Sequence, residues 1–166
     1  NRPVAVGITP NGNDAFVTNY DDNTVSEIYT PTNAVAATIA VGSEPDAIAI
    51  SPDGMTVWVA NYNDGTVNPI NVATGVVGAT VRVGSGPISE AVSPDGMTLY
   101  VVNYGSGTVS VVSTATHAVI ATIPVGYGPE GIAGTPDGAT LLVPNTASNT
   151  ISEISTSGAR SALTIR

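Results

Sequence analysis

A 42-residue repeat runs through the whole chain of 166 residues. Each copy is marked by two prolines, a glycine two residues after the second proline, an asparagine and a threonine. These residues are Pro3, Pro10, Gly12, Asn19 and Thr24 in the first copy, and they recur as Pro45, Pro52, Gly54, Asn61 and Thr66, as Pro87, Pro94, Gly96, Asn103 and Thr108, and as Pro129, Pro136, Gly138, Asn145 and Thr150. No insertion or deletion interrupts the register. A repeat of this length indicates a fold in which one supersecondary unit is built several times.

Each copy is predicted to form four short strands. In the second copy we expect strands at residues 47–50, 56–60, from 66 onward and at 76–83, with a Pro-Asp-Gly turn after the first. In that turn proline presets φ, aspartate can bond back to the backbone, and glycine takes the left-handed position. No segment shows a helical period of apolar residues. Four antiparallel strands in about 40 residues are typical of a propeller blade. We therefore predict an all-β, four-bladed β-propeller domain over residues 1–166, with blades at 1–42, 43–84, 85–126 and 127–166.

The second predicted strand carries the most specific motif. It reads Phe16-Val17-Thr18-Asn19, Trp58-Val59-Ala60-Asn61, Tyr100-Val101-Val102-Asn103 and Leu142-Val143-Pro144-Asn145. With the turns, this motif resembles the YVTN family of β-propeller repeats over the whole chain. The resemblance implies a propeller and an exported protein, in the periplasm, at the cell surface or in a surface layer. It implies no single activity, because related propellers include binding modules as well as lyases and lactonases. The fourth copy departs from the pattern at Pro144 and Thr146.

The number of blades raises a structural question. The resemblance implies rings of about six to eight blades, whereas an open arc of four exposes two apolar blade faces. Three arrangements remain open. Two chains could pair as a homodimer and complete an eight-bladed ring, the chain could be part of a larger propeller, or four blades could close on themselves.

Composition restricts the partners. The chain has a net charge of −9, with four arginines and no lysine, so its surface should repel the phosphate backbone of nucleic acids. No apolar run approaches the ~20 residues that cross a bilayer, so no membrane span is expected. Cysteine is absent and His117 is the only histidine, so neither a thiolate nor a multi-histidine metal site is available. We expect no metal and no cofactor. The acidic, lysine-free composition favours an extracellular, cell-surface or periplasmic location.

Acidic residues and tyrosines are predicted to gather on one rim. In a propeller, the loops between second and third strands share a rim with the connections between blades. The candidate ligand-binding residues on this rim are Tyr20, Asp21, Asp22, Glu44, Asp46, Tyr62, Asp64, Tyr104, Tyr127 and Glu130. Carboxylates mixed with tyrosines suit a cationic peptide or protein, a carbohydrate or Ca²⁺, although no loop has the spacing of an EF-hand. The alternative is that these side chains are solvated turn residues that keep the protein soluble.

Four further repeat positions carry either candidate chemistry or a structural role. Glu90 occupies a position that is apolar in the other copies, so its carboxylate must reach the channel, pair with a cation or become protonated. A local shift in strand alternation would turn it into the channel as a functional acid, and the alternative is a solvated or water-bridged structural acid. The aromatic position of the repeat is expected to fill the core between blades rather than to form a binding row. His117 is expected in a turn, and the asparagine after each motif is expected to bond to the backbone of the adjoining loop.

No nucleophile motif, phosphate-binding loop or catalytic triad appears in the sequence. We therefore expect a non-catalytic binding scaffold that offers its acidic, tyrosine-bearing rim to a partner. Two alternatives stay open. One is an architectural repeat of a surface layer or fibre, and the other is a lyase or hydrolase that uses channel carboxylates such as Glu90 and Asp46.

Overall fold

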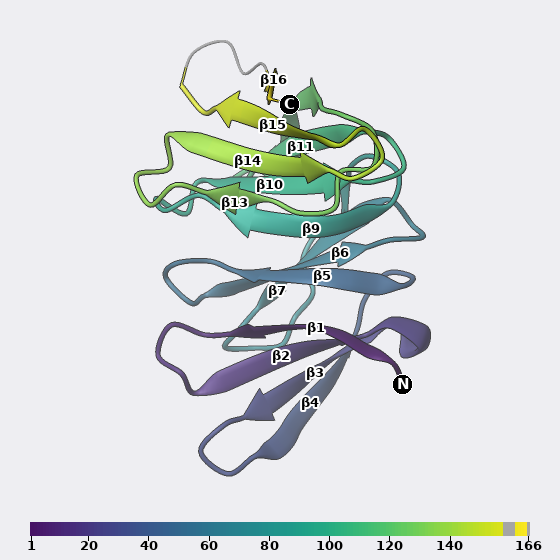
Figure 1. The fold of residues 1–166 in the computed structure, drawn as a ribbon. Helices are drawn as coiled ribbons and strands as arrows, with labels where there is room; N and C mark the ends of the chain where they lie inside the picture. The colour runs from purple at the N-terminus through teal and green to yellow at the C-terminus, as the bar shows by residue number, and fades with distance from the viewer. Residues whose placement is uncertain (158–161, 166) are drawn as a thin grey trace.

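The computed structural model describes residues 1–157 and 162–165, and in these residues sixteen strands form four antiparallel sheets of four strands each (Figure 1). Blade 1 comprises β1 (Pro3–Ile8), β2 (Asp14–Asn19), β3 (Thr24–Tyr29) and β4 (Ala34–Ala40), with a short 3-10 turn at Tyr20–Asp22. Blade 2 comprises β5 (Pro45–Ile50), β6 (Thr56–Asn61), β7 (Thr66–Asn71) and β8 (Val81–Arg82). Blade 3 comprises β9 (Pro87–Val92), β10 (Thr98–Asn103), β11 (Thr108–Ser113) and β12 (Ala118–Pro124). Blade 4 comprises β13 (Ala133–Gly134), β14 (Thr140–Asn145), β15 (Thr150–Ser155) and β16 (Ala162–Ile165).

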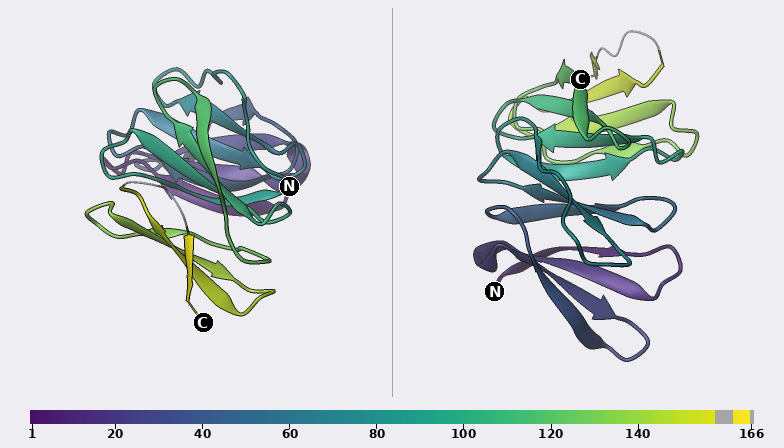
Figure 2. Two further views of the ribbon diagram at one scale, coloured as in Figure 1. Left: turned by 90° about the horizontal axis from the view of Figure 1, so that it is seen from above. Right: turned by 180° about the vertical axis from the view of Figure 1, so that it is seen from behind.

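The blades follow one another in sequence order, with the first strand of each lying innermost (Figures 1 and 2). Strand β5 contacts both β1 and β9, so the innermost strands of blades 1 to 3 form a continuous row. The predicted all-β propeller architecture with four strands per repeat is confirmed. The described residues include no helix that is both long and apolar enough to cross a membrane.

Apolar side chains fill the space between consecutive blades. Phe16, Trp58 and Tyr100 are at most 4% exposed and pack against the next blade in the chain, which confirms that their repeat position belongs to the core. Burying one such large side chain contributes about 1.5–3 kcal/mol. Leu142, at the same position in blade 4, is 41% exposed, because the described residues include no blade that follows blade 4.

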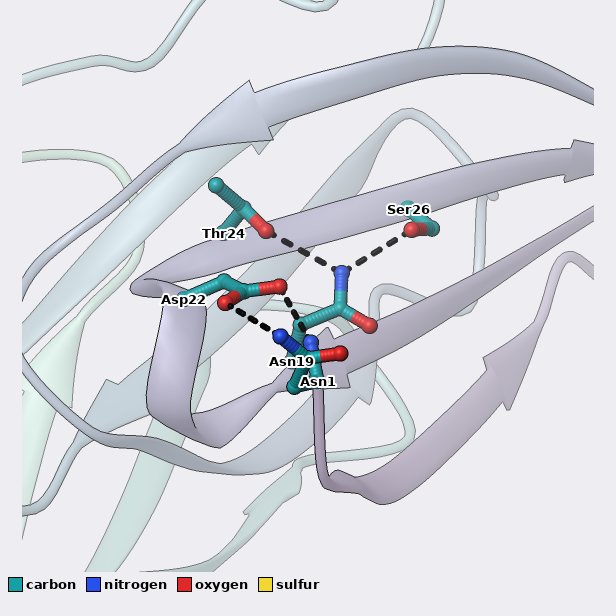
Figure 3. A network of polar contacts seen from close by, with 5 residues as sticks. All are labelled: Asn1, Asn19, Asp22, Thr24 and Ser26. Carbon is teal, nitrogen blue, oxygen red and sulfur yellow. Dashed lines mark hydrogen bonds and ion pairs between the residues drawn. The ribbon is translucent and has the colours of Figure 1, made fainter.

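The motif asparagine ties the second strand to the third. The Asn19 amide nitrogen donates to Thr24 Oγ1 at 3.1 Å and to Ser26 Oγ at 2.9 Å (Figure 3). Equivalent pairs of bonds occur in the other three blades. The expected bond to loop backbone occurs at Asn103, whose Oδ1 accepts from the Gly84 N–H at 3.1 Å, but the bonds shared by all four asparagines go to side chains. Their amides lie over the third strand, where the repeat supplies hydroxyl or amide acceptors two residues apart.

The turns after the innermost strands have the expected chemistry. In blade 3, Asp95 Oδ1 accepts hydrogen bonds from Ser93 Oγ at 2.5 Å and from the Met97 N–H at 2.9 Å. Gly96 adopts φ of 74° beside it, in the left-handed region. The bond from Ser93 and then that from Met97 lower the pKa of Asp95. His117 lies in the turn between β11 and β12, as predicted, with φ of 54°. Its ring meets the Trp58 ring edge-on, with 5.4 Å between the two ring centroids.

Two prolines shorten strands that the repeat predicts to be longer. The expected strand at 76–83 of blade 2 is reduced to β8 and an isolated bridge from Ile70 to Val77. The Pro69 carbonyl, which faces this outer strand, accepts from the Gly78 N–H, but proline has no N–H to donate on that side. Pro144 acts likewise in blade 4: its carbonyl accepts from the Glu130 N–H and faces the shortened strand β13.

Candidate active site on the rim

Two series of repeat positions meet at one end of the channel. The first series lies where each innermost strand begins and consists of Val4, Asp46, Ile88 and Glu130. The second follows each second strand and consists of Tyr20, Tyr62, Tyr104 and Thr146. The members of these series in blades 2 to 4 line a wide hollow of about 370 Å³, which is bounded by Asp46, Tyr62, Ile88, Tyr104 and Glu130. The hollow thus places two carboxylates and two phenols around one apolar side chain.

Asp46 lies in this hollow beside other charges. Its side chain is partly buried, and burial raises the pKa of its carboxyl group above the ordinary aspartate value. The Arg2 guanidinium opposes this increase in pKa, and the Glu44 carboxylate adds to it. A carboxylate with a raised pKa is a stronger base than an ordinary aspartate, which suits proton abstraction from water.

Arg2, Tyr20 and Glu44 form a polar cluster next to Asp46. The Tyr20 hydroxyl donates to Glu44 Oε2 at 2.7 Å, and the Arg2 guanidinium lies 4.1 Å from the centre of the Tyr20 ring. The hydrogen bond to Glu44 and then burial raise the pKa of Tyr20 to about 12, so its phenol keeps its proton. Arg2 and Glu44 have φ of 55° and 57°, in the left-handed region.

The left-handed backbone at these two positions is unusual. Blades 3 and 4 place glycines there, Gly86 and Gly128, with φ of 63° and 64°. A left-handed conformation costs a residue with a Cβ about 1–3 kcal/mol, and residues held in it cluster at functional sites. In blades 1 and 2, the charged rim residues Arg2 and Glu44 therefore have a strained backbone conformation.

Glu130 closes the opposite side of the hollow. Its Oε1 accepts a hydrogen bond from Thr146 Oγ1 at 3.0 Å, and its N–H donates to the Pro144 carbonyl at 3.1 Å. Thr146 stands where the earlier blades have tyrosine, so the atypical fourth copy exchanges a phenol for a short donor. One oxygen of Glu130 is thus held by blade 4.

Glu90 does not reach the channel. It pairs in regular register with Val101, so the strand alternation is not shifted, and it faces the interface between blades 2 and 3. Its two carboxylate oxygens are buried, and among the described residues they have no hydrogen-bond partner of regular geometry. Burial raises the pKa of Glu90 to about 8, and the nearby N–H of Ala49 offsets only part of this increase. The expectation that Glu90 reaches the channel is therefore wrong, and its raised pKa agrees with the sequence-based alternative that a carboxyl group at this apolar position becomes protonated.

Of the remaining candidate residues, four lie outside the hollow. Asp22 pairs with the N-terminal amine of Asn1 (Figure 3), and Asp21 lies 3.8 Å from Arg2 at the exposed edge. Asp64 accepts the Ser43 N–H at 2.7 Å and lines a separate groove. Tyr127 is 79% exposed. The structure therefore brings Asp46, Tyr62, Tyr104 and Glu130 together, places Tyr20 and Glu44 beside them, and leaves the other rim candidates apart.

Sequence reasoning missed Arg2 and Ile88. Arg2 shares its repeat position with Glu44, and Ile88 shares its position with Asp46, so an alignment of the four copies on those positions would have found both. The described residues contain no group of three or more His, Cys, Asp or Glu side chains arranged to hold a metal ion.

Comparison with known proteins gives the evolutionary context of this site. Residues 36–125, more than half of the chain, match the model of the lactonase family, described as a seven-bladed β-propeller. The chain belongs to the lactonase family of β-propellers. The matched segment contains Asp46, Tyr62, Ile88 and Tyr104, four of the five residues that line the hollow. The match supports the propeller and does not address the YVTN type of repeat.

Solved structures show the same fold. A chain of hydrazine synthase from Kuenenia stuttgartiensis is 25% identical, with a TM-score of 0.93 over 98% of this chain and 48% of its own. Proteins from Bacteroides fragilis and Bacteroides uniformis, provisionally assigned as 6-phosphogluconolactonases, are 22% and 20% identical, with TM-scores of 0.86 and 0.85. They are covered over 55% and 53% of their length, and this chain over 99% and 97%. The lactonase-family chain thus spans about half the length of these structures. No curated protein matches it.

The lactonase match corrects the functional expectation. A non-catalytic binding scaffold is contradicted, because the family is named for a hydrolytic activity and two structural neighbours carry a lactonase description. These findings favour the alternative of a lyase or hydrolase. The residue named first for that alternative, Glu90, is buried between blades, whereas Asp46 lies in the hollow.

Proposed function

We propose that this chain forms part of a hydrolase that opens lactones, with its reaction in the rim hollow of blades 2 to 4. The observation that carries the proposal is the coincidence of two findings. The lactonase family match covers residues 36–125, and within that segment the chain places a partly buried aspartate and two tyrosines around one hollow. A carboxylate base and phenolic donors are the groups that lactone hydrolysis needs.

In this proposal Asp46 acts as the general base. It takes a proton from a water molecule, whose oxygen attacks the carbonyl carbon of the lactone. The bond between that carbon and the ring oxygen then breaks, and the ring oxygen leaves as a hydroxyl after it accepts the proton that Asp46 took from the water. Lactone and water are thereby converted into one hydroxy acid. The raised pKa of Asp46 supports this role, because it strengthens the base.

Tyr62 and Tyr104 supply hydroxyl donors near the same centre. A donor aimed at the carbonyl oxygen stabilises the negative charge that develops there during attack, and loss of one such donor typically lowers kcat by about 10²–10³-fold. Ile88 between the two carboxylates offers an apolar surface for the carbon skeleton of the ring. Glu130, held by Thr146, is proposed to accept a hydrogen bond from a substrate hydroxyl.

The charge of the hollow bears on the substrate class. Two carboxylates line it, Glu44 lies beside it, and Arg2 is the cationic residue that the structure places next to Asp46. A phosphorylated lactone would bring further negative charge to these carboxylates. We therefore propose an uncharged lactone, such as that of a sugar without a phosphate, as the preferred substrate.

The test is hydrolysis of glucono-δ-lactone and of its 6-phosphate by the purified chain. We expect faster turnover of the neutral lactone, and a loss of about 100-fold or more in kcat for Asp46→Asn. Asp64→Asn, which changes a rim aspartate outside the hollow, is the matched control and should keep activity. Absence of turnover for both lactones, or full activity of Asp46→Asn, would refute the proposal.

Two finer expectations from the sequence stay predictions. One is that the repeats are of the YVTN type, which rests on the aromatic-Val-x-Asn motif of the second strands. The other is location outside the cytoplasm, which rests on the acidic, lysine-free composition and on the resemblance.

A further inference from the structure

The structure contains a polar groove on the outer side of blades 1 and 2, separate from the rim hollow. This outer groove has a volume of about 400 Å³, within the range of about 300–1,000 Å³ that is typical of small-molecule sites. The end of the outer strand of blade 1 forms one wall, and the two outer strands of blade 2 form the other. Its polar lining consists of Asp64, Thr66, Asn68, Thr80 and Arg82, none of which borders the hollow.

Arg82 gives the outer groove a positive charge. It is the only lysine or arginine in residues 43–126. The neighbouring Val81 is 3% exposed and packs in the junction between blades 2 and 3, so strand alternation turns the Arg82 side chain to the opposite face, toward blade 1. Both ion pairs among the described residues are formed by Asn1 and Arg2. The Arg82 guanidinium therefore has no carboxylate partner among those residues and can bind a carboxylate in a bidentate manner.

Two hydroxyl groups add hydrogen-bond donors to the same groove. Thr66 Oγ1 accepts from the Asn61 amide at 3.0 Å, and Thr80 Oγ1 accepts from the Asn68 amide at 2.9 Å. A hydroxyl that accepts a hydrogen bond still has its own proton to donate. No other described residue takes either proton, so both hydroxyls can donate to a ligand. Thr66 pairs directly with Arg82 across strands β7 and β8, which places the two side chains on the same face.

Asn68 holds these donors in place. Its side chain is 4% exposed, and its Oδ1 accepts from the Asn61 amide at 2.8 Å and from the Gly42 N–H at 3.0 Å. Its own amide reaches Thr80, where the backbone ladder of blade 2 is missing, because strand β8 comprises Val81–Arg82 only. The equivalents in the other blades are shorter serines, at positions 26, 110 and 152. The donor set is therefore ordered before a ligand arrives, which lowers the entropy cost of binding.

The repeat supplies an internal comparison for this site. A second groove of about 310 Å³ lies between blades 2 and 3, with Thr108, Ser110 and Thr122 at the positions of Thr66, Asn68 and Thr80. Arg82 borders this second groove from the preceding blade, but its side chain points to the other face of blade 2. The equivalent of Arg82 in blade 3 is Pro124. The shape of the groove therefore belongs to the repeat, whereas the cation within it is particular to the outer groove.

We propose that the outer groove binds a hydroxylated carboxylic acid with a single negative charge, such as a sugar acid. The carboxylate binds Arg82, and hydroxyl groups of the ligand accept from Thr66 and Thr80. One arginine matches one carboxylate. Further negative charge on the ligand is opposed by the net charge of −9 and by Asp64, whose Oδ2 accepts the Ser43 N–H at 2.7 Å. The proposal does not rest on lactone hydrolysis, because the outer groove and the hollow share no lining residue.

An NMR titration of the isotope-labelled chain tests the proposal residue by residue. Gluconate should shift the amide signals of residues 64–68 and 80–82, which surround the outer groove. Acetate has the carboxylate without the hydroxyl groups, and sorbitol has the hydroxyl groups without the carboxylate. Both should bind more weakly than gluconate, sorbitol by about 10-fold or more, because hydrogen bonds to a charged group contribute most. The signals of residues 46, 62 and 104 report on the hollow and distinguish the two sites.

Substitutions locate the contacts. Arg82→Gln should lower the affinity for gluconate by about 10-fold or more, because it removes the charged partner of the carboxylate. Thr80→Val should lower the affinity by about 3-fold, as expected for loss of one hydrogen bond between neutral groups. Thr122→Val changes the equivalent position of the second groove, so it is the matched control and should bind gluconate as the wild type does.

The proposal fails if millimolar gluconate shifts no signals, or if the shifts are confined to the residues of the hollow. Unchanged affinity of Arg82→Gln, with a well-dispersed spectrum that shows a folded chain, would exclude the arginine as the carboxylate ligand. Tighter binding of a galacturonate trimer than of galacturonate would overturn the limit to one negative charge, and would identify the ligand as a polysaccharide instead of a free acid.

Discussion

Replacing Glu90 with isoleucine, the residue at the equivalent positions 48 and 132, should remove a pH dependence of stability. In the folded protein the Glu90 carboxyl group is buried between blades 2 and 3, and burial raises its pKa from 4.5 to about 8. In the unfolded chain the group returns to its ordinary pKa. The folded state therefore binds one more proton than the unfolded state between these two values.

The magnitude follows from the shift in pKa. Because the folded pKa is raised, the contribution of Glu90 to stability is fully present below pH 4.5 and is lost as the pH rises to about 8. Each pH unit in this window lowers the free energy of unfolding by about 1.4 kcal/mol. At pH 7 the loss amounts to about 3 kcal/mol, a substantial part of the 5–15 kcal/mol that stabilises a typical domain.

Urea unfolding at pH 5, 7 and 8.5 measures this effect. Trp58 is the only tryptophan, is 1% exposed and lies in the same interface as Glu90, so its fluorescence reports directly on the opening of blades 2 and 3. Glu90→Ile should be more stable than the wild type at each pH, and its advantage should grow by about 4 kcal/mol from pH 5 to pH 8.5. Glu153→Gln, on a partly exposed strand, is the control for loss of one carboxylate.

An unchanged difference between wild type and Glu90→Ile across this range would refute the reasoning. It would mean that the Glu90 carboxylate is solvated or paired in solution. Lower stability of Glu90→Ile at pH 8.5 would be stronger evidence against it, because removal of a buried ionised group should stabilise the fold there.

Two further changes test the packing of the repeat. Gly84→Ala would place a Cβ 2.6 Å from Asn103 Cγ, so we expect a loss of about 1–3 kcal/mol and a lower midpoint in thermal unfolding. Gly131→Ala is its control, since the nearest atom lies at 3.7 Å, and equal losses in the two variants would contradict the steric explanation. Pro69→Val gives β7 an N–H that faces the outer strand, so β8 should lengthen and hydrogen exchange at residues 78–80 should slow. Unchanged exchange would show that another feature shortens the strand.

The sequence alone determined the architecture of each blade. The period of 42 residues, the Pro-Asp-Gly turns and the apolar strands are local features, and each predicts its element from the chemistry of a few adjacent residues. The buried aromatic position could be predicted as well, because one large side chain in every copy has to fill the same gap between sheets. The rim was also predicted as a region, since propeller loops alternate between the two ends.

Which rim residues meet was decided by the tertiary structure. Asp46 and Glu130 are 84 positions apart and line one hollow because blades 2 to 4 pack one after another. Glu90 was misplaced because the sequence shows an acid at an apolar position but not whether solvent reaches it. Leu142 was assigned to the core by its repeat position, yet it is exposed, because burial between blades requires a neighbouring blade. Periodicity specifies what each blade presents, and only the packing of blades determines what each face and loop contacts.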